Sequence, residues 1–441
     1  MRPEIKETPR DFATLKETLK NSNPVDIAEG LEELDDQQAI KLFRMLPKDI
    51  AAEVFAYLSR DMQESIVLTI KDYEISHIID ELFLDDAVDF IEEMPAIVVK
   101  RVLSQLPAEK RDIINHFLKY PEGSAGSIMT IEFVDLKEHL TVAEAFERIR
   151  KDGVDKETIY TCYVIDSERR LLGDVSAKAL LLASPDDKIG DIMQRDILFA
   201  VTSEDKESVA NDFRRYGLLA MPVVDNEHRL VGIVTVDDVM EVQEEEATED
   251  FELMAAMSPS DEPYLKTSVW KLTRNRLPWL LILMLTATIT GSIIGGFEEA
   301  LEVMPVLMMF IPMLMDTGGN SGAQSSTLVI RGIALEEIEM ADIAKVWWKE
   351  LRVALLCGGT LSIINFIRVL IMNRSSSIAF SVSLALYATV IISKSVGCLL
   401  PLLAKMIKVD PAVMAAPIIT TVVDAGALLV FFGIVKVMFQ I

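Results

Sequence analysis

The chain has 441 residues, 50% of them hydrophobic, and its 69 Asp and Glu outnumber its 43 Lys and Arg, giving a formal net charge of −26. A nucleic-acid partner is disfavoured because this excess of acid would repel a polyanion, and cations are the more natural partners. The length predicts several domains. The acids concentrate before about Asp261 and long apolar stretches follow from Leu277, so we expect an acidic soluble half and a membrane half.

Residues 1–120 predict an all-α domain. Met1 to Lys20 is charged and lacks an apolar core, so no secretory signal is expected and this half should stay in the cytosol. From Asp26 to Leu118, apolar residues recur at i, i+3 and i+4 between prolines, which is typical of short amphipathic helices. The pattern of Ala39 to Pro47 returns at Ala87 to Pro95, an offset of 87 − 39 = 48. This repeat predicts a superhelical stack of helical hairpins, with a plain helical bundle as the alternative.

Residues 121–236 are an internal duplication with α/β periodicity. Val164, Asp166, Arg170, Leu171, Gly173 and Val175 correspond to Val223, Asp225, Arg229, Leu230, Gly232 and Val234 (229 − 170 = 59). Asp166 and Asp225 are expected to open tight turns between two strands, each followed by a glycine where the second strand packs closely. The segment resembles a tandem pair of CBS domains.

CBS pairs often sense adenine nucleotides, so the resemblance implies ATP as a regulator. Their ligands contact a small hydroxyl residue and an Asp three positions later, which Thr235 and Asp238 match in the second copy. The first copy departs from this pattern, with Ser176 followed by Ala179. At most one nucleotide site per pair is therefore supported. The alternative is that Thr235 and Asp238 only cap the helix that follows the strand.

An acidic connecting helix is predicted in residues 237–265, where apolar and acidic residues alternate with helical spacing. Five apolar stretches follow, each long enough to cross about 30 Å of hydrocarbon: Leu277 to Phe297, Val306 to Ile330, Val353 to Met372, Ile378 to Leu403 and Val413 to Val437. Basic residues occur before the first stretch, between the second and third, and between the fourth and fifth, which places them all on one side of the membrane. They are Lys271, Arg274, Arg276, Arg331, Lys345, Lys349, Arg352, Lys405 and Lys408. These cations predict a multi-pass protein of the cell membrane with a cytosolic N-terminal half and the C-terminus outside.

Charged residues inside hydrocarbon are costly, so Asp316, Lys394 and Asp424 must face protein, water or one another. Asp316 lies in the run PMLMDTGGNSGAQ, whose proline and three glycines are expected to expose backbone carbonyls beside a wet cavity. Asp424 ends the run DPAVMAAPIITTVVD. Carboxylate, hydroxyl and amide oxygens are hard ligands that suit Mg2+ and other divalent cations.

These two runs resemble the paired motifs of MgtE magnesium transporters. The resemblance covers the chain from about residue 26 to its end and implies a homodimer with a membrane pore for Mg2+. It implies that Asp424 is the pore carboxylate, that Asn320 lies in the adjoining glycine-rich stretch, and that Asp410 lies near the cytosolic mouth. Asp316 in the second span and Thr420 in the fifth are further candidate pore ligands. Many members have Gly where this chain has Asp316, which leaves open whether Asp316 is a second ligand or pairs with Lys394.

The same resemblance implies regulatory Mg2+ at the junction of the N-terminal domain, the CBS pair and the connecting helix. The matching acids are Asp85, Asp86, Asp89, Asp238, Glu241, Glu246, Glu249 and Asp250. Ions bound there would close the pore at high Mg2+. Two other functions compete with transport of Mg2+: an intramembrane aspartyl protease using Asp316 and Asp424, and a CBS-regulated carrier of another solute. The residue before each aspartate is Met315 or Val423, not the glycine typical of such proteases, so a non-enzyme is expected.

Overall fold

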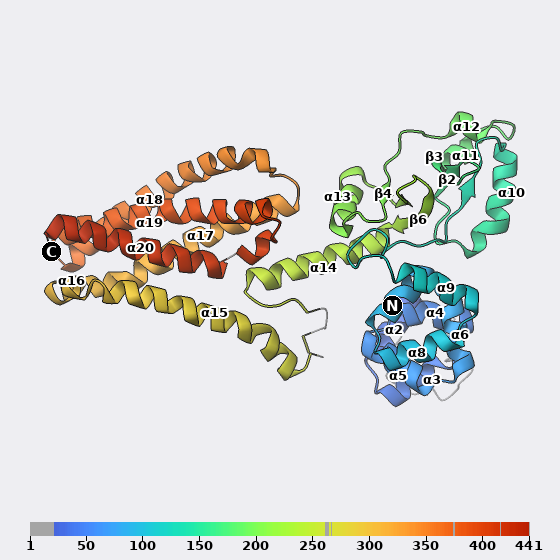
Figure 1. The fold of residues 1–441 in the computed structure, drawn as a ribbon, viewed down its shortest axis with the longest axis horizontal. Helices are drawn as coiled ribbons and strands as arrows, with labels where there is room; N and C mark the ends of the chain where they lie inside the picture. Colours follow the sequence, from blue (N-terminus) through green and yellow to red (C-terminus); the bar gives the residue numbers. More distant parts are fainter. Residues whose placement is uncertain (1–21, 261–263, 266, 374, 415, 441) are drawn as a thin grey trace. The chain divides into compact units, whose positions relative to one another are not determined.

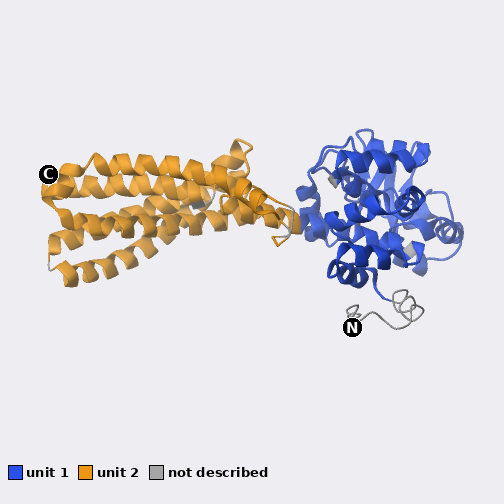
Figure 2. Ribbon diagram, turned by 90° about the horizontal axis from the view of Figure 1, so that it is seen from below, with its two compact units in different colours: residues 1–243 blue, residues 244–441 orange. Residues whose placement is uncertain are grey.

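The computed structural model describes residues 22–260, 264–265, 267–373, 375–414 and 416–440. The segment Met1 to Lys20, for which no secretory signal is expected, lies outside these residues. The chain divides into two compact units, Met1–Gln243 and Glu244–Ile441, which are coloured separately in Figure 2. Each unit is described by itself below, with the element labels of Figure 1.

The first unit begins with short helices that alternate with proline or polar turns. They are α2 (Pro24–Glu32), α3 (Asp36–Phe43), α4 (Lys48–Ala56), α5 (Arg60–Thr69), α6 (Asp72–Glu81), α7 (Leu84–Glu93), α8 (Ala96–Gln105) and α9 (Ala108–Phe117). Pro47, Pro95 and Pro107 stand at the N-caps of α4, α8 and α9, where a missing N–H costs nothing. Contacts run between every second helix: α2 with α4, α4 with α6, α6 with α8 and α7 with α9. This succession agrees with the predicted stack of hairpins.

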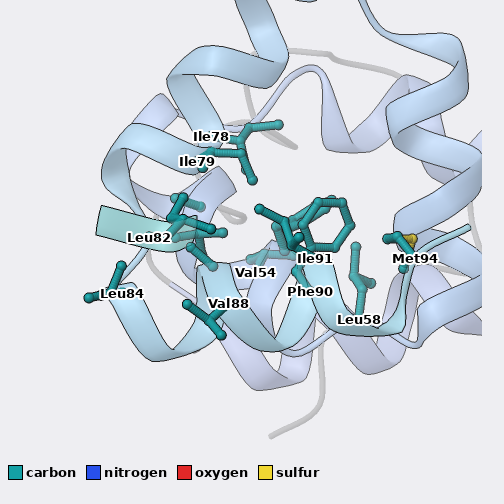
Figure 3. Close-up of a cluster of buried hydrophobic side chains, with 14 of the residues drawn as sticks. Val54, Leu58, Ile78, Ile79, Leu82, Leu84, Val88, Phe90, Ile91 and Met94 are labelled. Atoms are coloured by element: carbon teal, nitrogen blue, oxygen red, sulfur yellow. The ribbon is translucent and has the colours of Figure 1, made fainter. Parts of the chain in front are cut away.

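One continuous apolar core holds these helices together. Figure 3 shows part of it, where Val88, Phe90 and Ile91 of α7 gather with Val54 of α4 and Ile79 of α6. Phe55 and Phe90 meet edge to face at 5.1 Å between ring centroids. Burial of one side of α7 fixes the helix, so its acidic residues are held on a rigid element.

Two three-stranded sheets follow, one for each copy of the duplication. In the first, β1 (Asp135–Leu136) lies parallel to β2 (Thr161–Ile165), which pairs antiparallel with β3 (Leu171–Ser176). In the second, β4 (Ala200–Val201), β5 (Ala220–Val224) and β6 (Leu230–Thr235) repeat this order. The helices of the pair are α10 (Val142–Asp152), α11 (Ala177–Leu182), α12 (Ile189–Ile192) and α13 (Lys206–Tyr216), with a 3-10 turn at Gly153–Asp155.

The turns of the two copies obey the predicted repeat. Asp166 Oδ1 accepts the N–H groups of Glu168 and Arg170, each at 2.8 Å, and Asp225 makes the equivalent bonds in the second copy. Arg169 and His228 hold positive φ angles of 67° and 63° at matching positions. A side chain at Gly232 would collide with Met129 and the carbonyl of Thr130, which confirms the predicted close approach.

Helix α14 (Val236–Met254) follows β6 directly and crosses from the first unit into the second. Val239 and Val242 join the core of the first unit. Farther along, Leu253 packs with Ile330 and Ala412 of the second unit. An acidic helix is therefore present, but it begins one residue before the predicted segment 237–265 and ends at Met254.

The second unit is built from long helices: α15 (Val269–Gly295), α17 (Ile311–Ala334), α18 (Ile343–Asn373), α19 (Ser376–Met406) and α20 (Ala416–Phe439). The short elements α16 (Glu298–Val303), η2 (Pro305–Phe310), η3 (Met340–Asp342) and η4 (Pro411–Met414) connect them. Among the described residues, four helical stretches are long and apolar enough to cross a membrane: Val269–Gly295, Met340–Asn373, Ser376–Met406 and Pro411–Phe439. The second predicted span corresponds to α17, which is long enough but more polar.

Helix α17 differs from the expectation that its glycines expose backbone carbonyls. It is continuous from Ile311 to Ala334. A side chain at Gly318 would meet Thr389 of α19 and Val423 of α20, and one at Gly322 would meet Ser393 and Ile419. The glycines thus let neighbouring helices approach, as small residues do in membrane bundles. These glycines allow α19 and α20 to pack closely against α17, and the helix is not interrupted at any of them.

Candidate functional site

A cavity of about 510 Å³ in the second unit contains the carboxylate that the sequence singles out in the last helix. Its lining comes from α15, α17 and α20: Leu283, Thr286, Ala287, Thr290, Met315, Pro417, Thr420, Thr421 and Asp424. Thr420 and Thr421 are adjacent on α20 and lie about one turn before Asp424, as the spacing predicts. Thr286 and Thr290 of α15 were not predicted from the sequence; their hydroxyls are the only signal, and threonine is common in any apolar helix.

The backbone of α20 orients the threonine hydroxyls of this wall. Pro417 lies in the first turn of α20, and its carbonyl accepts the hydroxyls of Thr420 at 2.9 Å and Thr421 at 3.1 Å. Thr286 lies 3.3 Å from Thr421, oxygen to oxygen. No hydrogen bond or ion pair joins Asp424 to another side chain in the described part of the chain. A lone carboxylate among hydroxyls attracts cations, because its charge is uncompensated.

The other predicted membrane residues lie elsewhere. Asp316 and Asn320 occupy successive turns of α17, with the Asn320 amide donating to Asp316 Oδ1 at 3.1 Å. Both side chains are exposed in the single chain, and neither lines the cavity of Asp424. Asp410 precedes η4, where its Oδ1 accepts the N–H of Ala412 at 2.7 Å.

The hypothesis that Lys394 pairs with Asp316 is replaced by a different pairing. The ammonium of Lys394 in α19 donates to Ser325 Oγ of α17 at 3.2 Å and lies 4.0 Å from Glu350 of α18. Ser325 in turn donates to the same carboxylate at 2.6 Å. All three side chains are largely buried. Glu350 was missed because it precedes the apolar stretch Val353 to Met372 and reads as a residue outside the span.

A second polar region lies within the first unit, where α7 faces the start of α14. Asp85, Asp86 and Asp89 come from α7, and Asp238 and Glu241 from α14. Their charges act on one another: Asp85 with Asp238, Asp86 with Glu241, and Asp89 with both. The structure therefore brings together five of the eight predicted regulatory acids. We call this set the acidic junction.

Burial and mutual repulsion raise the pKa values of the four aspartates of the junction above their ordinary range. Burial, then the charge of Glu241, raises the pKa of Asp86 to about 6. Desolvation by the neighbouring helices, then the charge of Asp238, raises the pKa of Asp89 to about 8, although part of this side chain is exposed. Burial raises the pKa of Asp238 to about 7 although Thr235 donates to it, and burial raises the pKa of Asp85 well above its usual value. Desolvation disfavours each anion, and every like charge adds to the effect.

The junction also contains acids that were not predicted. Burial, followed by the charges of Asp237 and Asp238, raises the pKa of Glu157 to about 8. Glu157 Oε2 is buried without a hydrogen-bond partner among the described residues. Asp237 adjoins a predicted residue and could have been included, whereas Glu157 lies in a loop with no motif. Only the tertiary fold brings it to α7 and α14.

The remaining predicted acids lie farther along α14, in the second unit. Burial, then the charge of Asp410, raises the pKa of Asp250 to about 6. Asp250 and Asp410 were predicted separately, and the packing of Leu253 on Ala412 brings their segments together. Glu246 and Glu249 precede Asp250 on α14. Among the described residues, no three acidic, imidazole or thiol side chains are arranged to hold a metal ion between them.

The tentative nucleotide pair also has a local role. Thr235 donates its hydroxyl to Asp238 Oδ2 at 2.5 Å, and its N–H lies 3.4 Å from the same oxygen. This arrangement joins the end of β6 to the first turn of α14. In the first copy, Ser176 accepts the N–H of Ala179 at 3.1 Å and caps α11. Helix capping therefore accounts for Ser176, whereas the Thr235 hydroxyl donates to a side-chain carboxylate.

Comparisons with known proteins agree with this arrangement. The MgtE intracellular N domain matches residues 22–123, the CBS domain matches residues 125–186 and 189–245, and the MgtE divalent cation transporter domain matches residues 311–434. The magnesium transporter MgtE of Thermus thermophilus is 35% identical over 98% of this chain and 96% of its own length. The chain belongs to the MgtE family.

Other MgtE proteins support the same assignment. The magnesium transporter MgtE of Bacillus subtilis is 33% identical over 96% of this chain and 93% of its own. The crystal structure of the cytosolic domain of the Mg2+ channel MgtE in complex with ATP covers 53% of this chain and 95% of its own, with a TM-score of 0.50 and 36% identity. These matches confirm the helical N-terminal domain and the tandem CBS pair. The relatives are named as transporters, which points away from an enzyme such as the aspartyl protease.

Proposed function

We propose that this member of the MgtE family transports Mg2+ across the cell membrane along a path past Asp424. The observation that carries the proposal is the cavity in which one carboxylate lies among threonine hydroxyls. Mg2+ keeps several of its waters and binds through one or two carboxylates, so a cavity of about 510 Å³ that offers one carboxylate and four threonine hydroxyls suits the hydrated ion better than a tight cage. The full-length relatives that carry the name magnesium transporter support the choice of ion.

The cation dependence of flux through purified protein in liposomes tests this function. A Mg2+ gradient should drive uptake that protein-free vesicles lack. Mn2+, Co2+ and Ca2+, offered one at a time, measure selectivity among ions that oxygen ligands also accept. Absence of any divalent flux would overturn the proposal and favour a carrier of another solute.

We infer that the working unit is a homodimer. Asp316 and Asn320 of α17 are exposed in the single chain although they belong to an apolar helical unit. A carboxylate facing lipid is costly, whereas the same face lining a shared wet path is not. Cross-linking of Asn320→Cys measures proximity of two copies: a dimer band is expected, with Leu328→Cys on the same helix as the matched control. Equal cross-linking at both positions would contradict a specific interface.

The basic residues beside the spans support an N-terminal unit in the cytosol and a C-terminus outside. Cysteine labelling with a membrane-impermeant reagent tests this orientation in intact cells. The variant Lys178→Cys in α11 should stay unlabelled at that position until the cells are opened. Labelling there in intact cells would reverse the topology.

The acidic junction is proposed as the cytosolic Mg2+ sensor, together with Glu246, Glu249 and Asp250 farther along α14. Carboxylates are the right ligands for Mg2+, and the neighbouring like charges of α7 and α14 repel until a cation or a proton compensates them. Bound Mg2+ would favour a compact N-terminal unit with α14 held in the arrangement that closes the pore. High cytosolic Mg2+ would then stop its own entry.

Limited proteolysis of residues 237–257 over a Mg2+ titration tests the sensor. Protection should rise with Mg2+ in the parent and rise less when Glu246, Glu249 and Asp250 are changed to Gln, Gln and Asn. Flux of that variant should persist at high Mg2+. Equal protection and equal inhibition in the two proteins would move the sensor elsewhere.

ATP binding to the CBS pair is a further part of the proposed regulation. It is supported by the related cytosolic domain that was crystallised with ATP and by Thr235 and Asp238 in the second copy. Calorimetric titration of ATP into the full chain should show binding, and Thr235→Val should weaken it more than Ser176→Ala in the first copy. Equal effects of the two changes would assign only capping roles to both hydroxyls.

A further inference from the structure

We propose that the first three turns of α18 form a binding site for the headgroup of an anionic phospholipid. The inference rests on the membrane placement of the second unit and goes beyond transport of Mg2+. It begins with α18, whose neighbours with extensive contacts are α19 and the short turn η3. Its buried residues, Ala354, Gly358, Asn365 and Val369, form a single side. The opposite side of α18 is exposed on the outside of the helical bundle.

That opposite side runs along the whole helix, and its residues change from basic to aliphatic after Arg352. Residues 345, 349, 352, 356, 363, 367 and 370 recur at spacings of three, four and seven, so they lie on one face. The first three are Lys345, Lys349 and Arg352, and the last four are Leu356, Ile363, Ile367 and Leu370. All seven are exposed in the chain. An exposed face that passes from cations to aliphatic side chains matches the boundary between lipid headgroups and acyl chains.

The cationic end of this face has the chemistry of a phosphate site. Trp348, 55% exposed, lies among the three cations, and tryptophan prefers the headgroup level of a membrane. Lys345 is held 2.6 Å from Asp342, but Lys349 and Arg352 have no acidic partner in the described part of the chain. Arg352 donates its Nε to the Trp348 carbonyl at 3.3 Å, which leaves the end of the guanidinium available. Two uncompensated cations in a chain with a net charge of −26 favour an anionic partner.

Charge and position together select a lipid as this partner. The cations adjoin Leu356 and Ile363, which are 75% and 65% exposed, and only an amphiphile satisfies both parts of the face at once. A soluble anion would contact the cations alone. Juxtamembrane cations each contribute about 1 kcal/mol to attraction toward an anionic lipid surface. Phosphatidylglycerol, with one phosphate and two acyl chains, is the simplest probe of this chemistry.

Native mass spectrometry of the full chain in detergent, titrated with phosphatidylglycerol or with phosphatidylcholine of the same acyl chains, tests the site. The parent should bind phosphatidylglycerol more tightly. Lys349→Gln with Arg352→Gln should lower that affinity roughly ten- to thirty-fold and leave phosphatidylcholine binding unchanged. Lys405→Gln with Lys408→Gln removes two charges near the end of α19 and should keep the affinity of the parent. Equal affinity of the parent for both lipids, or an equal loss in the two double variants, would overturn the proposal.

Two further measurements distinguish a lipid site from a packing role of Lys349 and from a site for a soluble anion. Lys349→Arg keeps the charge and should retain the preference for phosphatidylglycerol; its loss there would indicate packing and overturn the site. Glycerol phosphate carries the anion without acyl chains and should not displace the lipid, whereas full displacement would show a soluble-anion site instead. Mg2+ flux of the parent in phosphatidylcholine vesicles tests transport separately, so failure of the lipid site leaves the proposed function standing.

Discussion

In the first unit, carboxylates of α7 and α14 share one junction in which Asp85 is buried and the others are partly or fully exposed, whereas in the second unit the charged side chains of the membrane helices are separated. Asp424 lies alone among threonine hydroxyls, and Lys394 contacts Glu350. Like charges gathered together raise one another's pKa and store repulsion that a proton or a divalent ion relieves. A single carboxylate beside threonine hydroxyls attracts a passing ion without enclosing it. A buried ion pair is neutral as a whole and can serve packing.

The largest effect is expected when the lone carboxylate is removed. Asp424→Ala should reduce Mg2+ flux in liposomes to that of protein-free vesicles while the chain still assembles, because no other described acid lines the cavity. Asp424→Asn keeps an oxygen and should also lose flux, through lost attraction. Thr290→Val, which removes a hydroxyl from the same cavity, is the matched control and should have a smaller effect. Near-normal flux in Asp424→Ala would refute the assignment.

The buried ion pair should respond through stability. Lys394→Met leaves Glu350 buried without its cation and should destabilise the membrane unit by about 3–5 kcal/mol, as breaking a buried pair does. Glu350→Gln should also destabilise, and the double variant should recover much of the loss because no charge remains unpaired. Thermal unfolding of the detergent-solubilised chain measures this.

The matched cycle for that prediction uses the residue first considered as the partner of Lys394. Asp316→Asn should add independently to Lys394→Met, since Asp316 contacts Asn320 instead. Strong coupling between Asp316 and Lys394, with none between Glu350 and Lys394, would contradict the observed pairing.

The acidic junction predicts an unusual pH dependence. The pKa of Asp89 rises from 3.8 to about 8 in the folded chain, so between these values the folded state binds more protons than the unfolded state. Stability then falls as pH rises from about 4 to about 8, and screening by solvent reduces the size of that fall because the Asp89 side chain is exposed. Hydrogen exchange of α7 and α14 with a chelator present should show this loss of protection.

Two changes should flatten that dependence. Asp89→Asn removes the group that must ionise, and Mg2+ added at pH 8 compensates the ionised junction. Glu53→Gln, which neutralises an acid outside the junction, should leave the pH dependence in place. Protection that rises with pH in the parent would exclude repulsion as the controlling force.

The sequence predicted much of the fold because its repeats are internal. Asp166 and Asp225 mark equivalent turns at an offset of 59, and the structure gives each the same two backbone hydrogen bonds. Helical periodicity likewise located the helices of the first and second units. Such patterns are local, so the residues that cause them are close in the chain.

Contacts between distant segments were harder to foresee. Glu157 reaches the acidic junction from a loop, and Glu350 reaches Lys394 from outside an apolar stretch; neither has a spacing that indicates its partner. The glycines of α17 have two physical uses, exposing backbone or allowing close packing, and only the positions of Thr389 and Ser393 decide between them. The cavity residues of α20 were found because a carboxylate inside an apolar helix is itself the signal.

The smallest effect is expected at the contact between the end of α14 and η4. Asp410→Asn keeps an oxygen to accept the N–H of Ala412 and removes only the charge that acts on Asp250, so it should lower the pKa of Asp250 from about 6 toward its ordinary value. Burial is the larger cause of that shift and remains. One carboxylate fewer should weaken Mg2+ protection of residues 244–257 from proteolysis only a few-fold, because Asp410 is exposed and screened by water. Asp342→Asn, at another acid of the second unit, should leave this protection unchanged. If the two variants respond alike, the charge of Asp410 acts through the general field of the unit, and the pairing with Asp250 has no special role in holding α14.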